Sequence, residues 1–183
     1  MMDRESFDVI IIGGGLAGLS LAIQLADAKR NVLLFEKNKY PFHRVCGEYI
    51  SMESWDFLER VGMPLREWNL PRITKLRVSS VNGTMIQHAL DLGGFGISRY
   101  MLDHALFEMA KARGVTVMEE SRADDVEKVG EVFFVSAKQE KYQSKVVVGA
   151  FGKRSNMDKK LERSFDAVPQ PRTKNWVGVK YHV

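Results

Sequence analysis

The sequence predicts an α/β fold with a parallel central sheet, to which the beginning of an antiparallel second sheet is added. Residues 7–12 form a short apolar run that leads directly into three glycines, a helical pattern and a second apolar run. Later apolar runs and helical patterns continue this order, as expected for strands of one parallel sheet. An alternating hairpin at residues 73–90 does not fit that sheet, so it predicts strands of a second one.

The composition is that of a soluble globular protein. The chain has 183 residues, of which 45% are hydrophobic and 27% are charged. The single cysteine, Cys46, cannot form an internal disulfide, and no targeting segment is recognisable, so we expect a cytoplasmic protein. Residues 9–26 carry no charge, but their three consecutive glycines disfavour a membrane span. We therefore expect no stable membrane insertion.

Basic residues gather near the C-terminus. From Lys153 onwards the chain has eight basic and three acidic residues, against a net charge of +4 for the whole. Such a strip could meet nucleic acid, a membrane surface or a phosphorylated cosubstrate, but a solvated or docking face is the simpler interpretation. Few aromatic residues are interleaved with it, so we expect no nucleic-acid partner.

The glycine turn predicts a nucleotide site. Gly13, Gly15 and Gly18 follow the spacing G-x-G-x-x-G. Gly13 permits a tight turn, Gly15 allows a diphosphate close to the backbone, and Gly18 lets helix and strand pack closely. The helix N-terminus then offers N–H groups and a positive dipole end to the anion. The residues expected to bind the diphosphate are Gly13, Gly14, Gly15, Leu16, Ala17 and Gly18.

Glu36 ends the second apolar run and lies 18 residues after Gly18. At the carboxyl end of that strand, its carboxylate can accept hydrogen bonds from an adenosine ribose. Together with the glycine turn, this predicts a Rossmann-like dinucleotide-binding domain. The residues alone leave both NAD and FAD open as the ligand.

A resemblance to a flavoprotein group narrows this choice. The segment GGGLAG, the pair Glu36-Lys37 and the segment HisArgValCysGlyGlu resemble FAD-dependent oxidoreductases of the geranylgeranyl reductase and flavin halogenase type, within the p-hydroxybenzoate hydroxylase-like flavoproteins. The resemblance implies that the FAD site includes Lys37, that Arg44 reaches the diphosphate or ring edge, and that Cys46 and Gly47 pass close to the flavin. A planar guanidinium suits diphosphate oxygens. For Cys46 we favour a small structural residue over a redox thiol.

The next segment predicts a helix and a hairpin. Ser51 is a suitable N-cap for a helix that ends at Gly62. Residues 73–79 and 84–90 alternate and are joined by Asn82-Gly83, which predicts a type I′ turn.

The following elements return to the central sheet. A helix that begins near Arg99 ends at Gly114, and residues 115–118 form the third parallel strand. Residues 126–137 and 142–148 form a hairpin-like pair, and the second of these strands returns to the main sheet.

Three further residues complete the expected cofactor site. Arg99 is a cation at a helix N-terminus, where it is unfavourable, and the resemblance implies that it contacts the flavin cofactor. The resemblance also implies that the backbone of Ala123 passes the adenine and that Gly149 opens a second glycine motif. In this motif Phe151 replaces an aspartate, which weakens the case for direct NADPH binding. NAD(P)H remains an open choice of reductant.

The expected function follows from this resemblance. It is an FAD-dependent oxidoreductase, either a monooxygenase, a halogenase-like enzyme or an alkene reductase, acting on a small or lipidic organic substrate. The alternatives are an NAD(P)-dependent dehydrogenase and a non-enzymatic nucleotide-binding protein. No residue pattern predicts a catalytic acid–base pair or a metal site, since the flavin itself carries the chemistry.

The alternating residues 175–183 predict a strand of a substrate domain that is only begun. We therefore expect an FAD-binding domain at residues 1–72 and 91–165, and strands of an incomplete substrate domain at 73–90 and 172–183. The chain is expected to be part of a longer enzyme and inactive without the remainder of that flavoprotein chain.

Overall fold

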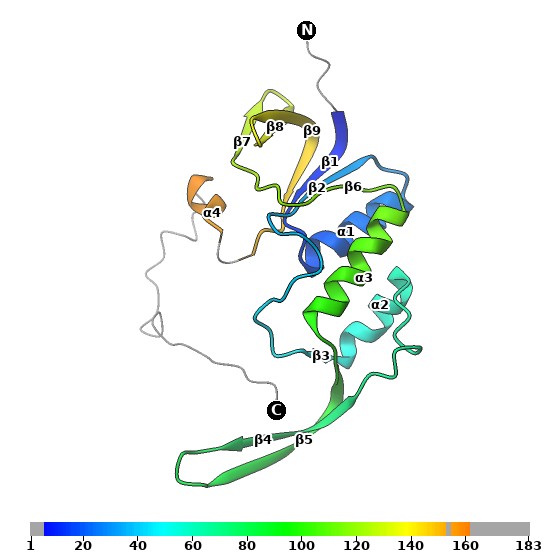
Figure 1. The fold of residues 1–183 in the computed structure, drawn as a ribbon, viewed down its shortest axis with the longest axis vertical. Helices are drawn as coiled ribbons and strands as arrows, with labels where there is room; N and C mark the ends of the chain where they lie inside the picture. The colour runs from blue at the N-terminus through cyan, green and yellow to red at the C-terminus, as the bar shows by residue number, and fades with distance from the viewer. Residues whose placement is uncertain (1–5, 153–154, 162–183) are drawn as a thin grey trace. The chain divides into compact units, whose positions relative to one another are not determined.

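The computed structural model describes residues 6–152 and 155–161. These residues form two compact units. Figure 1 labels the α-helices and strands of both units. The first unit contains the described residues up to Tyr40 and from Leu106 onwards, and the second contains Pro41–Ala105. The domain boundaries expected from the sequence stay a prediction, and the strand expected at residues 175–183 lies outside the described residues.

The first unit is built on a six-stranded sheet with the strand order β6-β2-β1-β9-β8-β7. β1 pairs in parallel with β2 and β9, and β2 pairs in parallel with β6. The predicted parallel sheet, its third strand and the return of the last strand are thereby confirmed. The strands are β1 (Ser6–Ile12), β2 (Val32–Phe35), β6 (Thr116–Met118), β7 (Asp125–Val129), β8 (Val132–Ala137) and β9 (Glu140–Gly149).

One strand prediction in this sheet is wrong. Residues 126–137 are not one strand, because β7 and β8 form an antiparallel pair in which Val129 lies opposite Val132. The two residues between them include Gly130, whose φ of 61° suits the first position of a type II′ hairpin turn. The Val-rich composition continued across this glycine and concealed the reversal.

The core of this unit lies around β1 and β2. Ile10, Ile11, Leu33 and Leu34 are completely buried, as expected for strands covered on both faces. The buried residues of α1 (Leu16–Asp27), which include Leu19 and Ile23, recur at helical spacing and so share one face of the helix. Full burial of each such side chain contributes about 1.5–3 kcal/mol to folding. This core holds the carboxyl ends of the parallel strands in place.

α3 (Arg99–Ala112) begins in the second unit and ends in the first. Leu102 and Leu106, four residues apart on this helix, are both fully buried. Gly114, with a φ of 86°, follows the helix as predicted. A short helix, α4 (Met157–Lys160), ends the described chain.

The second unit contains a three-stranded antiparallel sheet with the order β3-β5-β4. Its strands are β3 (Tyr49–Ser51), β4 (Arg72–Ser79) and β5 (Met85–Gly96). The predicted second sheet is confirmed, but β3 was not predicted and β5 continues beyond Leu90. A 3₁₀ helix, η1 (Met52–Ser54), leads into α2 (Trp55–Val61). Ser51 accepts a hydrogen bond from the Glu53 N–H and so caps η1, whereas the N-cap of α2, the helix that ends before Gly62, is Ser54.

The turn of the β4–β5 hairpin differs from the prediction. A type I′ turn requires positive φ at both central residues, but of Asn82 and Gly83 only Gly83 has one, at 86°. The Ser80 N–H donates to Thr84 O, and the Gly83 N–H donates to Ser80 O. These bonds define a three-residue loop in which a glycine follows a type I turn.

Candidate functional site

The glycine turn lies where β1, β2 and β9 end. The Gly13 N–H donates to Phe35 O at 2.8 Å, and the Ala150 N–H donates to Ile12 O at 2.8 Å. Gly13 has a φ of 110°, and a Cβ there would lie 2.5 Å from Ala150 O. A Cβ on Gly18 would overlap the Gly13 carbonyl oxygen. The predicted reasons for glycine at positions 13 and 18, a tight turn and close packing, are therefore confirmed.

The turn leads into the N-terminus of α1. Gly15 is the N-cap, so no side chain bonds the first-turn N–H groups from this position, and the first turn carries no acidic residue. Leu16 is half-buried and Ala17 is exposed. This arrangement suits an anion, which would meet N–H donors and the positive end of the helix dipole. Contact of Gly15, Leu16 and Ala17 with a diphosphate stays a prediction.

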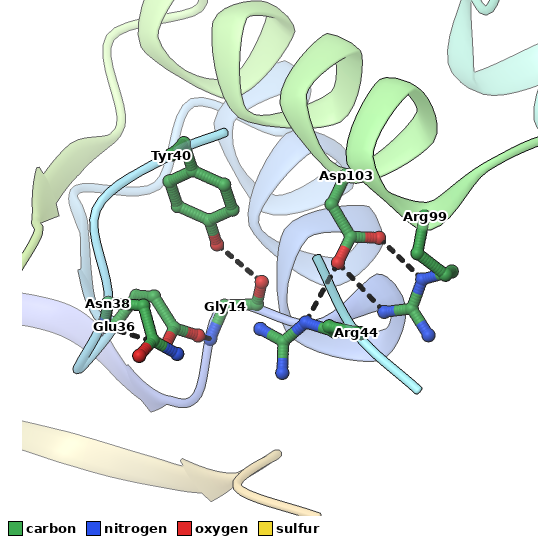
Figure 2. Close-up of polar contacts among 7 residues, drawn as sticks. All are labelled: Gly14, Glu36, Asn38, Tyr40, Arg44, Arg99 and Asp103. Atoms are coloured by element: carbon green, nitrogen blue, oxygen red, sulfur yellow. Dashed lines mark hydrogen bonds and ion pairs between the residues drawn. The ribbon is translucent and has the colours of Figure 1, made fainter. Parts of the chain in front are cut away.

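Glu36 forms a hydrogen bond with the glycine turn. Its carboxylate is buried, and Oε2 accepts a hydrogen bond from the Gly14 N–H at 3.0 Å (Figure 2). Oε1 accepts from the N–H and from Nδ2 of Asn38, at 3.0 and 2.9 Å. Its predicted contact with a ribose is untested, and neither its bond to the turn nor Asn38 was predicted. Lys37 is exposed beside it.

Tyr40 is the second side chain on the turn. Its hydroxyl donates a hydrogen bond to Gly14 O (Figure 2). Its ring stacks on Phe107 of α3, with centroids 4.4 Å apart and an interplanar angle of 18°. Its backbone N–H donates to Glu119 Oε1 at 2.7 Å. Sequence reasoning missed Tyr40, although an aromatic residue directly after the polar residues 37–39 was a usable signal.

Arg44 and Arg99, both in the second unit, share one carboxylate. Asp103 Oδ2 accepts from Arg44 Nε at 3.0 Å, and its two oxygens accept from Arg99 Nε and Nη2 at 2.7 and 2.8 Å (Figure 2). The Asp103 side chain is only 2% exposed. Asp103 also explains how a cation is tolerated at the start of α3, since it lies one helical turn further on.

Two opposing effects act on the pKa of Arg99. Burial disfavours its charged form, but the hydrogen bonds and negative charge of Asp103, with a smaller contribution from Cys46, outweigh burial and raise the pKa. Arg99 is therefore a permanent cation. With Arg44 it makes a set of two positive charges and one negative charge.

Cys46 and Gly47 belong to the same loop as Arg44. Cys46 is half-buried and its sulfur accepts a hydrogen bond from the Glu48 N–H at 3.4 Å. Gly47 is exposed, and a Cβ there would have no neighbour within 4 Å. Their predicted closeness to a flavin is untested.

Ala123 and Gly149 lie in the first unit. Ala123 is buried in a cluster that includes Phe35 and Tyr142. Gly149 ends β9 opposite Ile12, and the Phe151 ring lies 2.7 Å from where a Gly149 Cβ would be. Phe151 thus packs over Gly149 and against this apolar cluster. The contact of Ala123 with adenine and the place of Gly149 in the cofactor site stay predictions.

The predicted site residues therefore form two sets, one in each unit. The glycine turn, Glu36 and Gly149 come together at the carboxyl ends of parallel strands, which is where ligands of open α/β sheets bind. Arg44 and Arg99 meet on Asp103. In the described ranges, no cluster of three or more His, Cys, Asp or Glu residues is arranged to hold a metal ion. Of the helices described, none is long and apolar enough to cross a membrane.

The family model for the FAD binding domain matches residues 6–183, so the chain belongs to this family. The chain is 29% identical over 165 residues to digeranylgeranylglycerophospholipid reductase of Methanosarcina acetivorans, which covers 84% of this chain and 40% of the reductase. It thus spans about two fifths of that relative's length. The flavoprotein resemblance seen in the sequence is confirmed.

Solved structures share the fold. The flavin-dependent halogenase CmlS superposes with a TM-score of 0.71 at 24% identity, over 88% of this chain and 32% of the halogenase. A geranylgeranyl bacteriochlorophyll reductase-like protein of Thermoplasma acidophilum gives a TM-score of 0.70 at 21% identity, over 87% and 43% of the two chains. These likenesses confirm the predicted fold class.

Proposed function

We propose that this chain binds FAD on its glycine turn and is the FAD-binding part of an FAD-dependent oxidoreductase. The observation that carries this proposal is the turn itself. Gly13 and Gly18 cannot carry a Cβ without overlap, and Gly15 caps α1 without a side chain, so a ligand at this position would meet the backbone N–H groups of the first turn of α1. Such a turn fits the diphosphate of FAD.

Different residues of this chain would contact different parts of the cofactor. Gly13, Gly14, Gly15, Leu16, Ala17 and Gly18 would hold the diphosphate. Glu36, with Lys37 beside it, would hold the ribose, and the backbones of Ala123 and Gly149 would border the adenosine half. Arg44 and Arg99 would add positive charge for the diphosphate, with Cys46 and Gly47 near the ring. FAD, when bound, supplies the redox chemistry, while the protein supplies position and electrostatics.

For the whole protein we propose a monooxygenase, halogenase-like or alkene reductase activity on a small or lipidic organic substrate, with NAD(P)H as the reductant. The names of its relatives, a lipid reductase and a halogenase, support this range. The match to the FAD binding domain family favours FAD over the NAD(P)-dependent dehydrogenase considered from the sequence. The remainder of the flavoprotein chain would complete the substrate side.

The test is a titration with FAD followed by flavin fluorescence. Gly15→Val should abolish binding, because a branched side chain would occupy the space proposed for the diphosphate. Ala28→Val is the matched control, since it adds a branched side chain at the exposed C-cap of the same helix. Equal FAD affinity in Gly15→Val, or tight NAD binding without FAD binding by calorimetry, would overturn the proposal.

A further inference from the structure

Gly14 occupies a variable position of the glycine motif, and the spacing G-x-G-x-x-G does not require a glycine there. Its φ is not positive, so backbone conformation does not require one either. The residues around position 14 explain why it is a glycine. A Cβ on Gly14 would overlap the Tyr40 hydroxyl oxygen, and it would lie 3.0 Å from Glu36 Cβ and 3.2 Å from Leu34 Cδ2.

Two side chains hold the backbone of Gly14 from opposite ends. Glu36 accepts from the Gly14 N–H, and Tyr40 donates to the Gly14 carbonyl. Because a trans peptide points its C=O and N–H in opposite directions, the Tyr40 bond directs the next N–H, that of Gly15, away from the Tyr40 hydroxyl. The two bonds together fix both peptide planes that surround Gly14.

Tyr40 is itself held rigidly. The residue is 6% exposed, its ring stacks on the buried Phe107, and its backbone N–H donates to Glu119. A hydroxyl fixed in this way loses little additional freedom when it bonds the turn, so the bond orders the turn rather than the tyrosine.

We propose that Tyr40 is a positioning residue that holds the Gly14–Gly15 peptide in the orientation that binds the diphosphate of FAD. This inference rests on the proposed function. A turn held in its binding conformation avoids the ordering cost at the moment of binding, so the benefit appears as ligand affinity.

The test compares Tyr40→Phe with Tyr142→Phe. Both tyrosines are buried in the first unit, and each hydroxyl donates a hydrogen bond, that of Tyr40 to the backbone carbonyl of Gly14 and that of Tyr142 to Glu140 Oε2 at 2.5 Å. Tyr40→Phe should weaken FAD binding about threefold to tenfold, the value of one hydrogen bond, while Tyr142→Phe should leave the affinity unchanged. In the FAD-free protein, hydrogen exchange at the amides of residues 13–16 should be faster only in Tyr40→Phe.

In a second comparison, the effect of Tyr40→Phe on FAD affinity should change sign when Gly14 is replaced by alanine. Gly14→Ala should weaken FAD binding because its methyl group would overlap the Tyr40 hydroxyl. Tyr40→Phe should strengthen binding in the Gly14→Ala background, since the nearest remaining contact would be 3.0 Å, although the same change weakens it in the wild type.

The outcomes separate the two proposals. A wild-type protein that binds no FAD would refute the proposed function, and the exchange rates would still decide whether Tyr40 orders the turn. Wild-type binding with equal FAD affinity in Tyr40→Phe and Tyr142→Phe would overturn the role of Tyr40, as would a further loss of affinity when Tyr40→Phe is added to Gly14→Ala.

Discussion

Replacing Asp103 by asparagine should destabilise the protein strongly. Asp103 is the shared acceptor of Arg44 and Arg99, and its side chain is 2% exposed. Asparagine keeps the shape of the side chain but removes its charge. The two guanidinium groups then remain close together without the carboxylate that compensates them.

The size of the effect follows from this geometry. Removing one partner of a buried ion pair costs about 3–5 kcal/mol. The Arg44 and Arg99 side chains keep 27% and 17% of their surface exposed, so water compensates part of the loss. We therefore expect the free energy of unfolding to fall by about 3 kcal/mol, which corresponds to a decrease in Tm of about 6–12 °C for a chain of this length.

The assay is thermal and urea unfolding of the wild type, Asp103→Asn and a control. The control is Glu59→Gln, which also removes a carboxylate that pairs with an arginine of the second unit. The Arg66–Glu59 pair is exposed, with 80% of the Arg66 side chain accessible, so its loss should lower the free energy of unfolding much less than the loss of the Asp103 charge. An Asp103→Asn protein no less stable than Glu59→Gln would refute the reasoning.

Three further predictions concern the cofactor and pH. Glu36→Ala should weaken FAD binding at least tenfold, because a charge-assisted hydrogen bond is worth about 1.5–3 kcal/mol; titration by flavin fluorescence measures this, and an unchanged affinity would exclude Glu36 from the site. Cys46→Ser should retain bound flavin with a nearly unchanged visible spectrum, and loss of turnover by the flavin-loaded enzyme would instead assign chemistry to the thiol. The Arg66 hydrogen bond lowers the pKa of Glu59 below its usual 4.5, so its stabilising contribution is present above pH 4.5 and lost as pH falls through the lowered pKa. The difference in stability between wild type and Glu59→Gln should thus shrink in acid. Urea unfolding across that range measures this difference, and a difference that stays constant with pH would contradict the prediction.

The elements that could be predicted from the sequence are those whose own residues determine their environment. β1 and β2 are buried on both faces, so their uninterrupted apolar runs identify them. β3 has only three residues and exists because it pairs with the end of β5, which no local pattern reveals. The β4–β5 loop was misassigned because Asn82-Gly83 occurs in more than one hairpin turn.

The residues of the candidate site also divide into those that a local sequence signal identifies and those that it does not. Glycine spacing and a strand-end acid identified the turn and Glu36, because both are local signals. Asp103 could not be identified, because its sequence context is that of an ordinary helix residue and its role depends on Arg44, 59 positions earlier. Arg99 was predicted as a site residue because a cation at a helix N-terminus is unfavourable without a partner and because the family resemblance implies a cofactor contact there.

Gly14 shows why a motif describes a binding turn incompletely. Spacing accounts for the glycines whose backbone the ligand or the helix approaches, and it leaves position 14 open. In this chain Glu36 and Tyr40 leave no room for a side chain at that position. They lie 22 and 26 residues further along and hydrogen-bond to the N–H and the carbonyl oxygen of Gly14. A substitution at Gly14 therefore acts first on contacts within the protein and only through them on the ligand. For the same reason, the effect of Gly14→Ala should depend on whether residue 40 carries a hydroxyl, a dependence that motif spacing alone cannot predict.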